Sequence, residues 1–211
     1  MALEPVAPPA ATLRLLGGAS LLVDGEPRLA RRFKTIALLG CLARAPGGRC
    51  RRAWLADLLW GDAGGERARH SLRQALADLR RHLGPVIRST PEEAWIERDG
   101  LHVDVDDFDA AVDAGAWEAA VAAWRGEFLA GADGSGTAAF AAWLAGERAA
   151  LGDRLALACA HLVADARDAG DADAALAHAD RWAALLPADE RGHRAVIELL
   201  AQTGRTGEAA I

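Results

Sequence analysis

Residues 66–83 concentrate basic side chains at a spacing that suits contact with a polyanion. The segment holds five arginines and two histidines against only two acids, Glu66 and Asp78. At 100° per residue its apolar positions fall on one face of a helix. That face is formed by Ala68, Leu72, Ala75, Leu76, Leu79 and Leu83. The opposite face carries Arg67, His70, Gln74, Ala77 and Arg81, with Arg69, Arg73 and Arg80 along one flank.

This division of faces is typical of a helix that lies in the major groove of double-stranded DNA. Arginine pairs with guanine and glutamine with adenine, whereas a flanking row of arginines holds phosphates and sets the register. The alternative is a solvated helix whose arginines pair with acids three or four residues away. Because only Glu66 and Asp78 oppose the cluster, most of its charge lacks a local partner, and the pattern favours groove binding.

Further basic residues stand where two preceding helices are expected to begin, and these can reach backbone phosphates. They are Arg31, Arg32 and Lys34 before the first helix, and Arg51 and Arg52 before the second. For each of them a solubilising surface role is an equal alternative. Arg88 is the one basic residue of the hairpin that follows residue 84. Its tip, Pro91-Glu92-Glu93, is acidic, so this wing either stays off DNA or contacts a protein.

The elements that must position the basic helix follow the order of a winged helix-turn-helix. Strand-like runs at 13–16 and 19–23, with a third near 27–29, precede helices at about 31–45, 52–60 and 66–83, and strands at 86–88 and 94–96 follow. In the first helix we expect an apolar stripe of Phe33, Ile36, Leu39 and Leu42 to face the core.

The second half of the chain has helical periodicity throughout. Helices are expected at 108–114, 116–124, 138–169, 171–185 and 189–202, and the longest of them is expected to break at Gly146 or Gly152. Gly170-Asp171 recurs as Gly204-Arg205 after 34 residues, which is the tetratricopeptide (TPR) period. Residues 208–211 look like the start of another helix, so we expect the chain to be truncated at its C-terminus.

The charge of the chain is divided between these halves. The 211 residues carry a formal net charge of −6, which taken alone argues against a nucleic-acid partner. However, residues 1–103 carry +5 and residues 104–211 carry −11. The distribution therefore restores DNA as the expected partner of the first half.

The residues quoted above resemble a known family. Residues 13–103, and in particular WLADLLWGDAGGERARHSLRQALADLRRHLG, resemble the OmpR/PhoB-type output domain found in SARP-type regulators. Residues 104–211 resemble the bacterial transcriptional activator domain (BTAD), through VDVDDF, WRGEFLAG, AAWLAGER and the stretch at 170–209. The prolines Pro5, Pro8 and Pro9 predict a short disordered lead-in at 1–12. The resemblance implies a mainly α chain, with an α+β winged helix-turn-helix at 13–103 and an all-α TPR-like domain at 104–211.

The resemblance also implies a transcriptional regulator that binds promoter DNA, contacts RNA polymerase or a signalling protein, and forms a homodimer. Carried over by position, the base-reading residues are Arg67, His70, Ser71, Gln74 and Arg81. Arg69, Arg73 and Arg80 become backbone contacts. The chain departs from the family at Arg51, where a capping Ser or Thr is usual. The alternative function is a protein-interaction or signalling module that has lost DNA binding and stands at the front of a larger effector.

Other chemistries find little support in the sequence, so we expect no enzyme activity, no cofactor and no metal. Asp104, Asp106, Asp107 and Asp109 could bind a hard cation, but more simply include a helix N-cap. No nucleophile–base pair or phosphate-binding Gly-rich loop stands at a usable spacing. Three scattered cysteines indicate a reducing cytoplasm, and no apolar run reaches the length of a membrane span.

Four tryptophans of the second half are expected to fill the core between Ala-rich helices. They are Trp117, Trp124, Trp143 and Trp182. The alternative is that some of them are exposed and form a groove for a partner, since exposed apolar patches mark interfaces.

Overall fold

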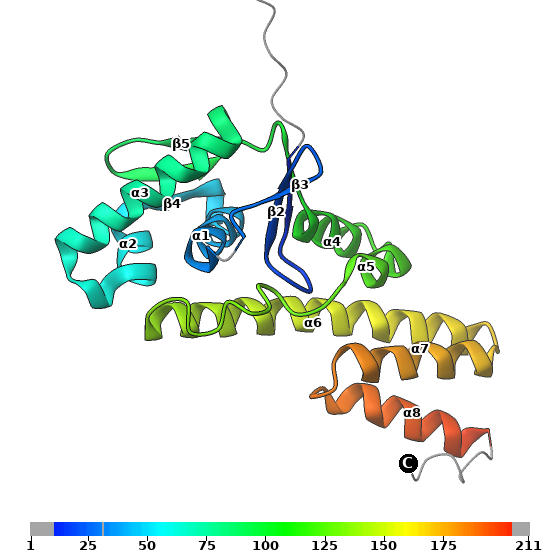
Figure 1. Ribbon diagram of the computed structural model, residues 1–211. Helices are drawn as coiled ribbons and strands as arrows, with labels where there is room; N and C mark the ends of the chain where they lie inside the picture. Colours follow the sequence, from blue (N-terminus) through cyan, green and yellow to red (C-terminus); the bar gives the residue numbers. More distant parts are fainter. Residues whose placement is uncertain (1–10, 31, 204–211) are drawn as a thin grey trace, which may run out of the picture. The chain divides into compact units, whose positions relative to one another are not determined.

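The computed structural model describes residues 11–30 and 32–203 (Figure 1). Strand β1 begins at Ala11, so Ala11 and Thr12 belong to a strand and not to the expected lead-in. The rest of that lead-in, Arg31 and the helix expected near residue 208 lie outside the described residues. The chain divides into two compact units, one within residues 1–105 and 127–147, the other within 106–126 and 148–211. Each unit is described separately below.

A four-stranded sheet opens the first unit. Its strands are β1 (Ala11–Arg14), β2 (Ser20–Val23), β3 (Glu26–Arg28) and β7 (Leu101–Val103), in the order β3-β2-β1-β7. Leu13 and Leu21 pair across the antiparallel β1–β2 ladder and are completely buried. Strand β7, which was not predicted, pairs parallel to β1 and sets Val103 beside Leu13.

Three helices and a second small sheet complete the winged helix, and they confirm the predicted order. The helices are α1 (Phe33–Ala43), α2 (Arg52–Trp60) and α3 (Gly65–Leu83). The sheet consists of β4 (Arg49–Arg51), β5 (Ile87–Ser89) and β6 (Glu93–Ile96), in the order β4-β6-β5. Single turns of 3₁₀ helix, η1 (Pro46–Gly48), η2 (Gly61–Ala63) and η3 (Gly84–Val86), link these elements.

Two details differ from the prediction. Phe33 is 45% exposed, because α1 begins at this residue, whereas Ile36, Leu39 and Leu42 of the expected stripe are buried. Strand β4 was missed, since three residues between a glycine turn and a helix are too few to show an alternation. It adds a third strand to the wing by pairing with β6.

The remaining elements are helical. They are α4 (Asp104–Asp113), α5 (Trp117–Ala123), α6 (Ala138–Asp168), α7 (Ala172–Leu185) and α8 (Glu190–Gln202). The expected break in the long helix is wrong, because α6 is continuous through Gly146 and Gly152. A glycine inside a helix costs only about 1 kcal/mol relative to alanine, and the helix-forming residues around both glycines outweigh that cost.

Helices α7 and α8 form the helix pair predicted from the TPR period, and they lie side by side in Figure 1. Gly192 of α8 is buried at their contact. A Cβ atom at this position would lie 3.0 Å from Cγ of Trp182 and 3.1 Å from the backbone N of Ala183. Glycine therefore allows a closer approach of the two helices than any other residue would.

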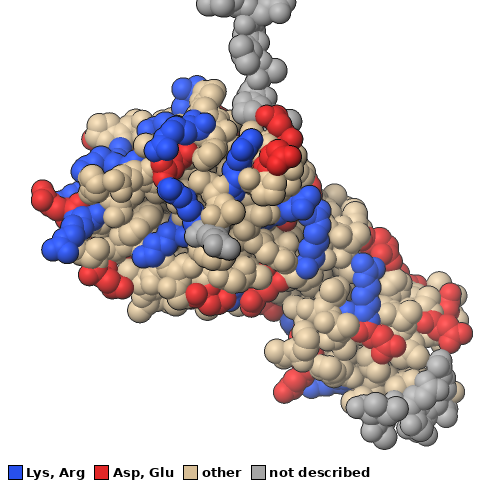
Figure 2. Space-filling model, in the orientation of Figure 1, with Lys and Arg blue, Asp and Glu red and all other residues tan. Residues whose placement is uncertain are grey.

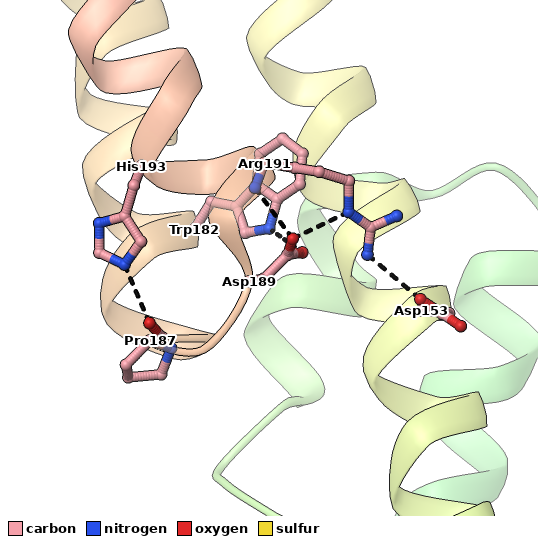
Figure 3. Close-up of polar contacts among 6 residues, drawn as sticks. All are labelled: Asp153, Trp182, Pro187, Asp189, Arg191 and His193. Carbon is pink, nitrogen blue, oxygen red and sulfur yellow. Dashed lines mark hydrogen bonds and ion pairs between the residues drawn. The ribbon is translucent and has the colours of Figure 1, made fainter.

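A polar network holds the turn between α7 and α8 (Figure 3). Asp189 caps α8 by accepting a hydrogen bond from the backbone N–H of Arg191 at 3.0 Å, and its other carboxylate oxygen accepts from Nε1 of Trp182 at 3.1 Å. The Arg191 guanidinium donates to Asp189 at 2.8 Å and to Asp153 of α6 at 3.1 Å. At the same turn, a ring nitrogen of His193 lies 3.0 Å from the carbonyl oxygen of Pro187.

Asp104 has a structural role that the sequence did not reveal. Its side chain is almost completely buried, and its carboxylate accepts hydrogen bonds from the backbone N–H groups of Leu15 at 2.8 Å and Leu16 at 3.2 Å. These two residues directly follow β1, where no strand partner takes up their amides in a regular ladder. The first aspartate of the acidic cluster therefore anchors the first sheet.

Residues 127–147 pack within the first unit. The backbone N–H of Leu129 donates to the carbonyl of Leu15 at 2.7 Å, and the Thr137 hydroxyl donates to the carbonyl of Leu58 at 2.8 Å. Farther along, Glu147 accepts from Nε of Arg44 at 2.8 Å. The N-terminal part of α6 is thus a component of the winged-helix unit.

The tryptophans divide into two kinds. Trp124 and Trp182 are buried, as predicted for core residues. Trp117 and Trp143 are partly exposed. Trp117 stacks on the ring of His161 at a centroid distance of 4.3 Å, whereas Trp143 lies against Phe128 and Phe140 at 6.1 and 5.6 Å.

Candidate nucleic-acid interface

Helix α3 separates its apolar and polar residues as the sequence predicts. All six residues of the apolar face are buried: Ala68, Leu72, Ala75, Leu76, Leu79 and Leu83. Of the five base-reading candidates, Arg67, His70, Gln74 and Arg81 are exposed and Ser71 is half-buried. Figure 2 shows Lys and Arg side chains gathered over the part of the surface that α2, α3 and the wing occupy.

The first half of α3 carries the least compensated charge. Arg67, Arg69 and Arg73 are exposed, and among residues 11–30 and 32–203 no carboxylate pairs with any of them. The N-terminus of a helix adds about half a positive charge to this region. These three guanidinium groups are therefore available to bind an anion.

A cleft of about 910 Å³ separates α3 from the beginning of α2 and the tip of the wing. Four arginines predicted to hold phosphates line it together: Arg51, Arg52, Arg69 and Arg73. Arg51 lies at the end of β4, Arg52 at the beginning of α2, and Arg69 and Arg73 on α3, and their convergence could not be derived from the sequence. Glu92 and Glu93 line the same cleft, and Glu93 of β6 is the cross-strand neighbour of Arg51 of β4, so the acidic wing tip lies beside the arginines.

A second cleft, of about 470 Å³, lies between the beginning of α1 and α3. Gln74, Ser71 and Arg32 line it together with Asp78, which forms ion pairs with both Arg32 and Arg81. Arg32 and Arg81, both predicted to contact DNA, thus share the carboxylate of Asp78 on α3, which reduces the net positive charge at this cleft.

Three other predicted phosphate contacts have partners within the protein. Lys34 donates from Nζ to the carbonyl of Leu59 at 3.0 Å, near the end of α2. Arg80 donates from Nε to the carbonyl of Ile87 at 3.2 Å and also bonds the hydroxyl of Ser89. Arg52 donates to the carbonyl of Thr90 at 2.8 Å. Arg80 and Arg52 therefore fix the wing to α3 and α2.

Two further arginines lie on the wing, of which Arg88 was predicted from the sequence to contact phosphate and Arg49 was not. Arg88 is exposed on β5. Arg49 on β4 lies over the ring of Trp95 at 3.8 Å and within 3.7 Å of the Glu93 carboxylate. The alternation of β4, with Arg49 and Arg51 outward and Cys50 inward, was the signal that could have identified it. Arg31 is outside the described residues.

Metal-binding and thiol chemistry find little support among the described residues. No group of three or more His, Cys, Asp or Glu side chains that could hold a metal occurs where the structure is described. Cys41, Cys50 and Cys159 are free and buried, and burial raises the pKa of the Cys50 and Cys159 thiols to about 11. No helix among the described residues is long and apolar enough to cross a membrane.

A winged helix with a basic third helix, followed in the chain by the helix pair α7–α8, is typical of proteins of the transcriptional-regulator type. The sequence profile described as "Bacterial transcriptional activator domain" matches residues 103–210. The chain therefore belongs to this family. The family expected from the sequence, the SARP-type regulators that join a winged helix to this domain, is thus confirmed.

A solved structure has the same fold. It is Mycobacterium tuberculosis EmbR in complex with a low-affinity phosphopeptide, with 21% sequence identity and a TM-score of 0.72. The match covers 95% of this chain and 57% of that chain, so this chain spans little more than half the length of EmbR. None of the curated proteins compared with the chain matches it significantly.

Proposed function

We propose that the protein binds double-stranded DNA, with α3 in the major groove and the arginine cleft on the phosphate backbone. Arg67, His70 and Gln74 then face base edges, with Ser71 and Arg81 at the margins of the contact. Arg51, Arg52, Arg69 and Arg73 hold phosphates. The observation that carries the proposal is that three arginines of α3 lack an acidic partner among the described residues, while two of them line one cleft with Arg51 of β4 and Arg52 of α2.

The remaining predicted contacts have smaller roles in this proposal. Arg32 and Lys34 stand at the second cleft and Arg88 on the wing, where each adds to the attraction of a phosphate chain. Arg80 acts mainly by positioning the wing. Arg31 lies outside the described residues, so its role as a phosphate contact is proposed from the sequence alone.

A salt series tests DNA binding. The affinity for a mixed-sequence duplex is measured from about 50 to 200 mM salt, because each neutralised phosphate contributes about −0.9 to the slope of log K against log salt. The variant Arg69→Gln/Arg73→Gln should flatten the slope by nearly two. Arg80 is left intact, because its removal would release the wing. A matched control, Arg14→Gln/Arg194→Gln, removes two exposed arginines elsewhere and should keep the slope.

We further propose that the acidic helical residues of the second unit contact a protein, either RNA polymerase, a signalling protein or a second copy of the chain, in the cytoplasm. The second unit, residues 106–126 and 148–211, carries 8 basic and 15 acidic side chains, and this net charge of −7 supports a partner other than DNA for this part. Sedimentation of the full chain over a concentration series tests the second copy: a mass that stays monomeric to high micromolar concentrations would exclude it.

The second candidate function is a protein-interaction module without DNA binding, at the front of a larger effector. Glu92 and Glu93 in the arginine cleft favour it, because they repel a phosphate chain. The same salt series decides between the two functions. Absence of duplex binding at low salt, or a slope that the Arg69→Gln/Arg73→Gln variant leaves unchanged, would favour the interaction module.

A further inference from the structure

A third cavity of about 620 Å³ lies within the first unit, away from the base-reading face of α3. It is enclosed by the end of α1, by η1 and β4, by the beginning of α2 and by the N-terminal part of α6. Its volume lies in the range of small-molecule sites, about 300–1,000 Å³. Its lining includes Cys41, Cys50, Arg51, Trp54, Trp143 and Glu147.

Two indole rings form the walls of this cavity. Trp54 and Trp143 meet edge to face, with ring centroids 6.5 Å apart and an interplanar angle of 81°. Trp143 is held from behind by Phe128 and Phe140. Trp54 is nevertheless 40% exposed, although a large aromatic side chain gains much from burial. An exposed ring beside a fixed ring at the mouth of a cavity offers a stacking surface for a planar aromatic molecule.

The inner lining of the cavity is uncharged. The thiols of Cys41 and Cys50 are buried, and the Cys50 thiol lies 3.7 Å from the carbonyl oxygen of Cys41. Burial raises the pKa of both thiols, so they remain protonated at neutral pH and act as polarisable apolar groups. The apolar part of a ligand is therefore expected to enter on this side.

The rim carries net positive charge, from three arginines against one glutamate. Glu147 is neutralised by Arg44, and Arg49 is occupied by Trp95 and Glu93. Arg51 is exposed, and no acidic side chain of the described residues pairs with it. An exposed guanidinium group without an acidic partner can bind a carboxylate through two parallel hydrogen bonds.

We propose that this cavity binds a small planar aromatic acid, whose ring stacks on the exposed indole of Trp54 and meets Trp143 with its edge, and whose carboxylate binds Arg51. Arg51 also lines the phosphate cleft with Arg52, Arg69 and Arg73. A carboxylate that holds Arg51 in the cavity withdraws its charge from that cleft. The ligand therefore weakens DNA binding, a consequence that rests on the proposed function, whereas the binding of the acid does not.

Calorimetric titration of the full chain with naphthalene-2-carboxylate tests the site without DNA. We expect one bound molecule per chain. Naphthalene-2-methanol keeps the rings but lacks the charge, and hexanoate keeps the charge but lacks the rings. Each should bind at least about ten-fold more weakly, because the first loses the ion pair with Arg51 and the second loses the aromatic contact.

Two variants and two matched controls locate the binding. Arg51→Gln and Trp54→Ala should each weaken binding of naphthalene-2-carboxylate about ten-fold or more. Arg88→Gln on the wing and Trp60→Ala, which faces the second cleft, should leave it within about two-fold. The Arg51→Gln variant changes an exposed side chain, so it remains informative even if Trp54→Ala lowers the stability of the fold.

Absence of one-to-one binding up to millimolar concentration would overturn the proposal, as would binding that both variants leave unchanged or that naphthalene-2-methanol equals. The effect on DNA is measured separately. Saturating naphthalene-2-carboxylate should lower duplex affinity in the natural chain but not in Arg51→Gln. Binding of the acid by a chain that does not bind DNA would support the cavity and overturn the proposed function instead.

Discussion

The carboxylate of Asp104 accepts a hydrogen bond from the backbone N–H of Leu15 at 2.8 Å, across 89 residues of chain. Its second oxygen accepts from the neighbouring amide of Leu16. A buried backbone N–H without a partner costs about 1–3 kcal/mol. One side chain at the beginning of α4 therefore satisfies two amides that follow β1, and it joins the last part of the winged helix to the first.

Replacement of this carboxylate should destabilise the fold. In Asp104→Ala both amides lose their acceptor, so the free energy of unfolding should fall by at least about 2 kcal/mol. Urea unfolding followed by circular dichroism measures the change. Asp57→Ala, at an exposed position of α2, is the control and should remain within about 0.5 kcal/mol of the natural chain. Equal stability of the two variants would contradict the role assigned to Asp104.

Gln74 should determine sequence preference more than overall affinity. Its side chain is exposed on α3 and lines the second cleft, beside the cleft of the four arginines, and an amide can bond an adenine edge with two hydrogen bonds. Selection of preferred sites from a random duplex library, with the natural chain and with Gln74→Ala, measures the change. A uniform loss of affinity for every sequence, with no change of preference, would show that another face of α3 enters the groove.

The wing tip should limit DNA affinity. Glu92 lines the cleft of the four arginines, so Glu92→Gln removes a charge that repels phosphate there. Removing one such charge should tighten duplex binding by roughly two- to five-fold at low salt, and less at high salt. Fluorescence anisotropy with a labelled duplex measures it. Glu26→Gln, at an exposed position of β3, removes the same charge elsewhere and is the control. Unchanged affinity in Glu92→Gln would place the wing tip off the DNA.

Acid should weaken the α7–α8 turn through Asp189. Burial opposes ionisation of this carboxyl group, but hydrogen bonds from Arg191 and Trp182 outweigh it and lower its pKa below the ordinary value. A lowered folded-state pKa adds stability above the unfolded-state pKa of about 3.9, and this stability is lost as the pH falls through the folded-state value.

The comparison of Asp189→Asn with the natural chain isolates this contribution. Asparagine keeps the size of the side chain but does not titrate, so the stability difference between the two chains should be constant above about pH 5 and should shrink below about pH 4. Urea unfolding at a series of pH values, followed by tryptophan fluorescence, measures it. A difference that grows towards acid pH would mean that the pKa is shifted in the opposite direction.

The boundary of the winged-helix unit should lie after residue 147. A fragment of residues 1–103 lacks Asp104 and the segment 127–147. The backbone N–H of Leu15 and the carbonyl of Leu58 then lose their hydrogen-bond partners, and the surface that Phe140 covers is exposed. It should unfold without a cooperative transition, whereas a fragment of residues 1–147 should unfold cooperatively. Thermal unfolding followed by circular dichroism distinguishes them. Equal cooperativity would show that residues 127–147 contribute little to the core.

Much of the fold was readable from local patterns. Apolar residues recur along α3 with the helical period, so the buried face from Ala68 to Leu83 and the opposing arginines could be derived without a structure. The 34-residue period likewise indicated the α7–α8 pair. Short elements were missed, because β4 and β7 have three residues each, and such strands exist only through their pairing with distant strands.

Which helix carries the positive charge could be derived from the amino-acid sequence, because periodicity and residue type are local properties. Which arginines remain available depends instead on how the helices and strands pack. Asp78 pairs with Arg32, which directly precedes α1, Arg80 is bound to the wing, and Arg51 and Arg69 converge on one cleft. These contacts join residues that are far apart in the chain. The distance between such residues is set by tertiary packing, and a local sequence pattern carries no information about it.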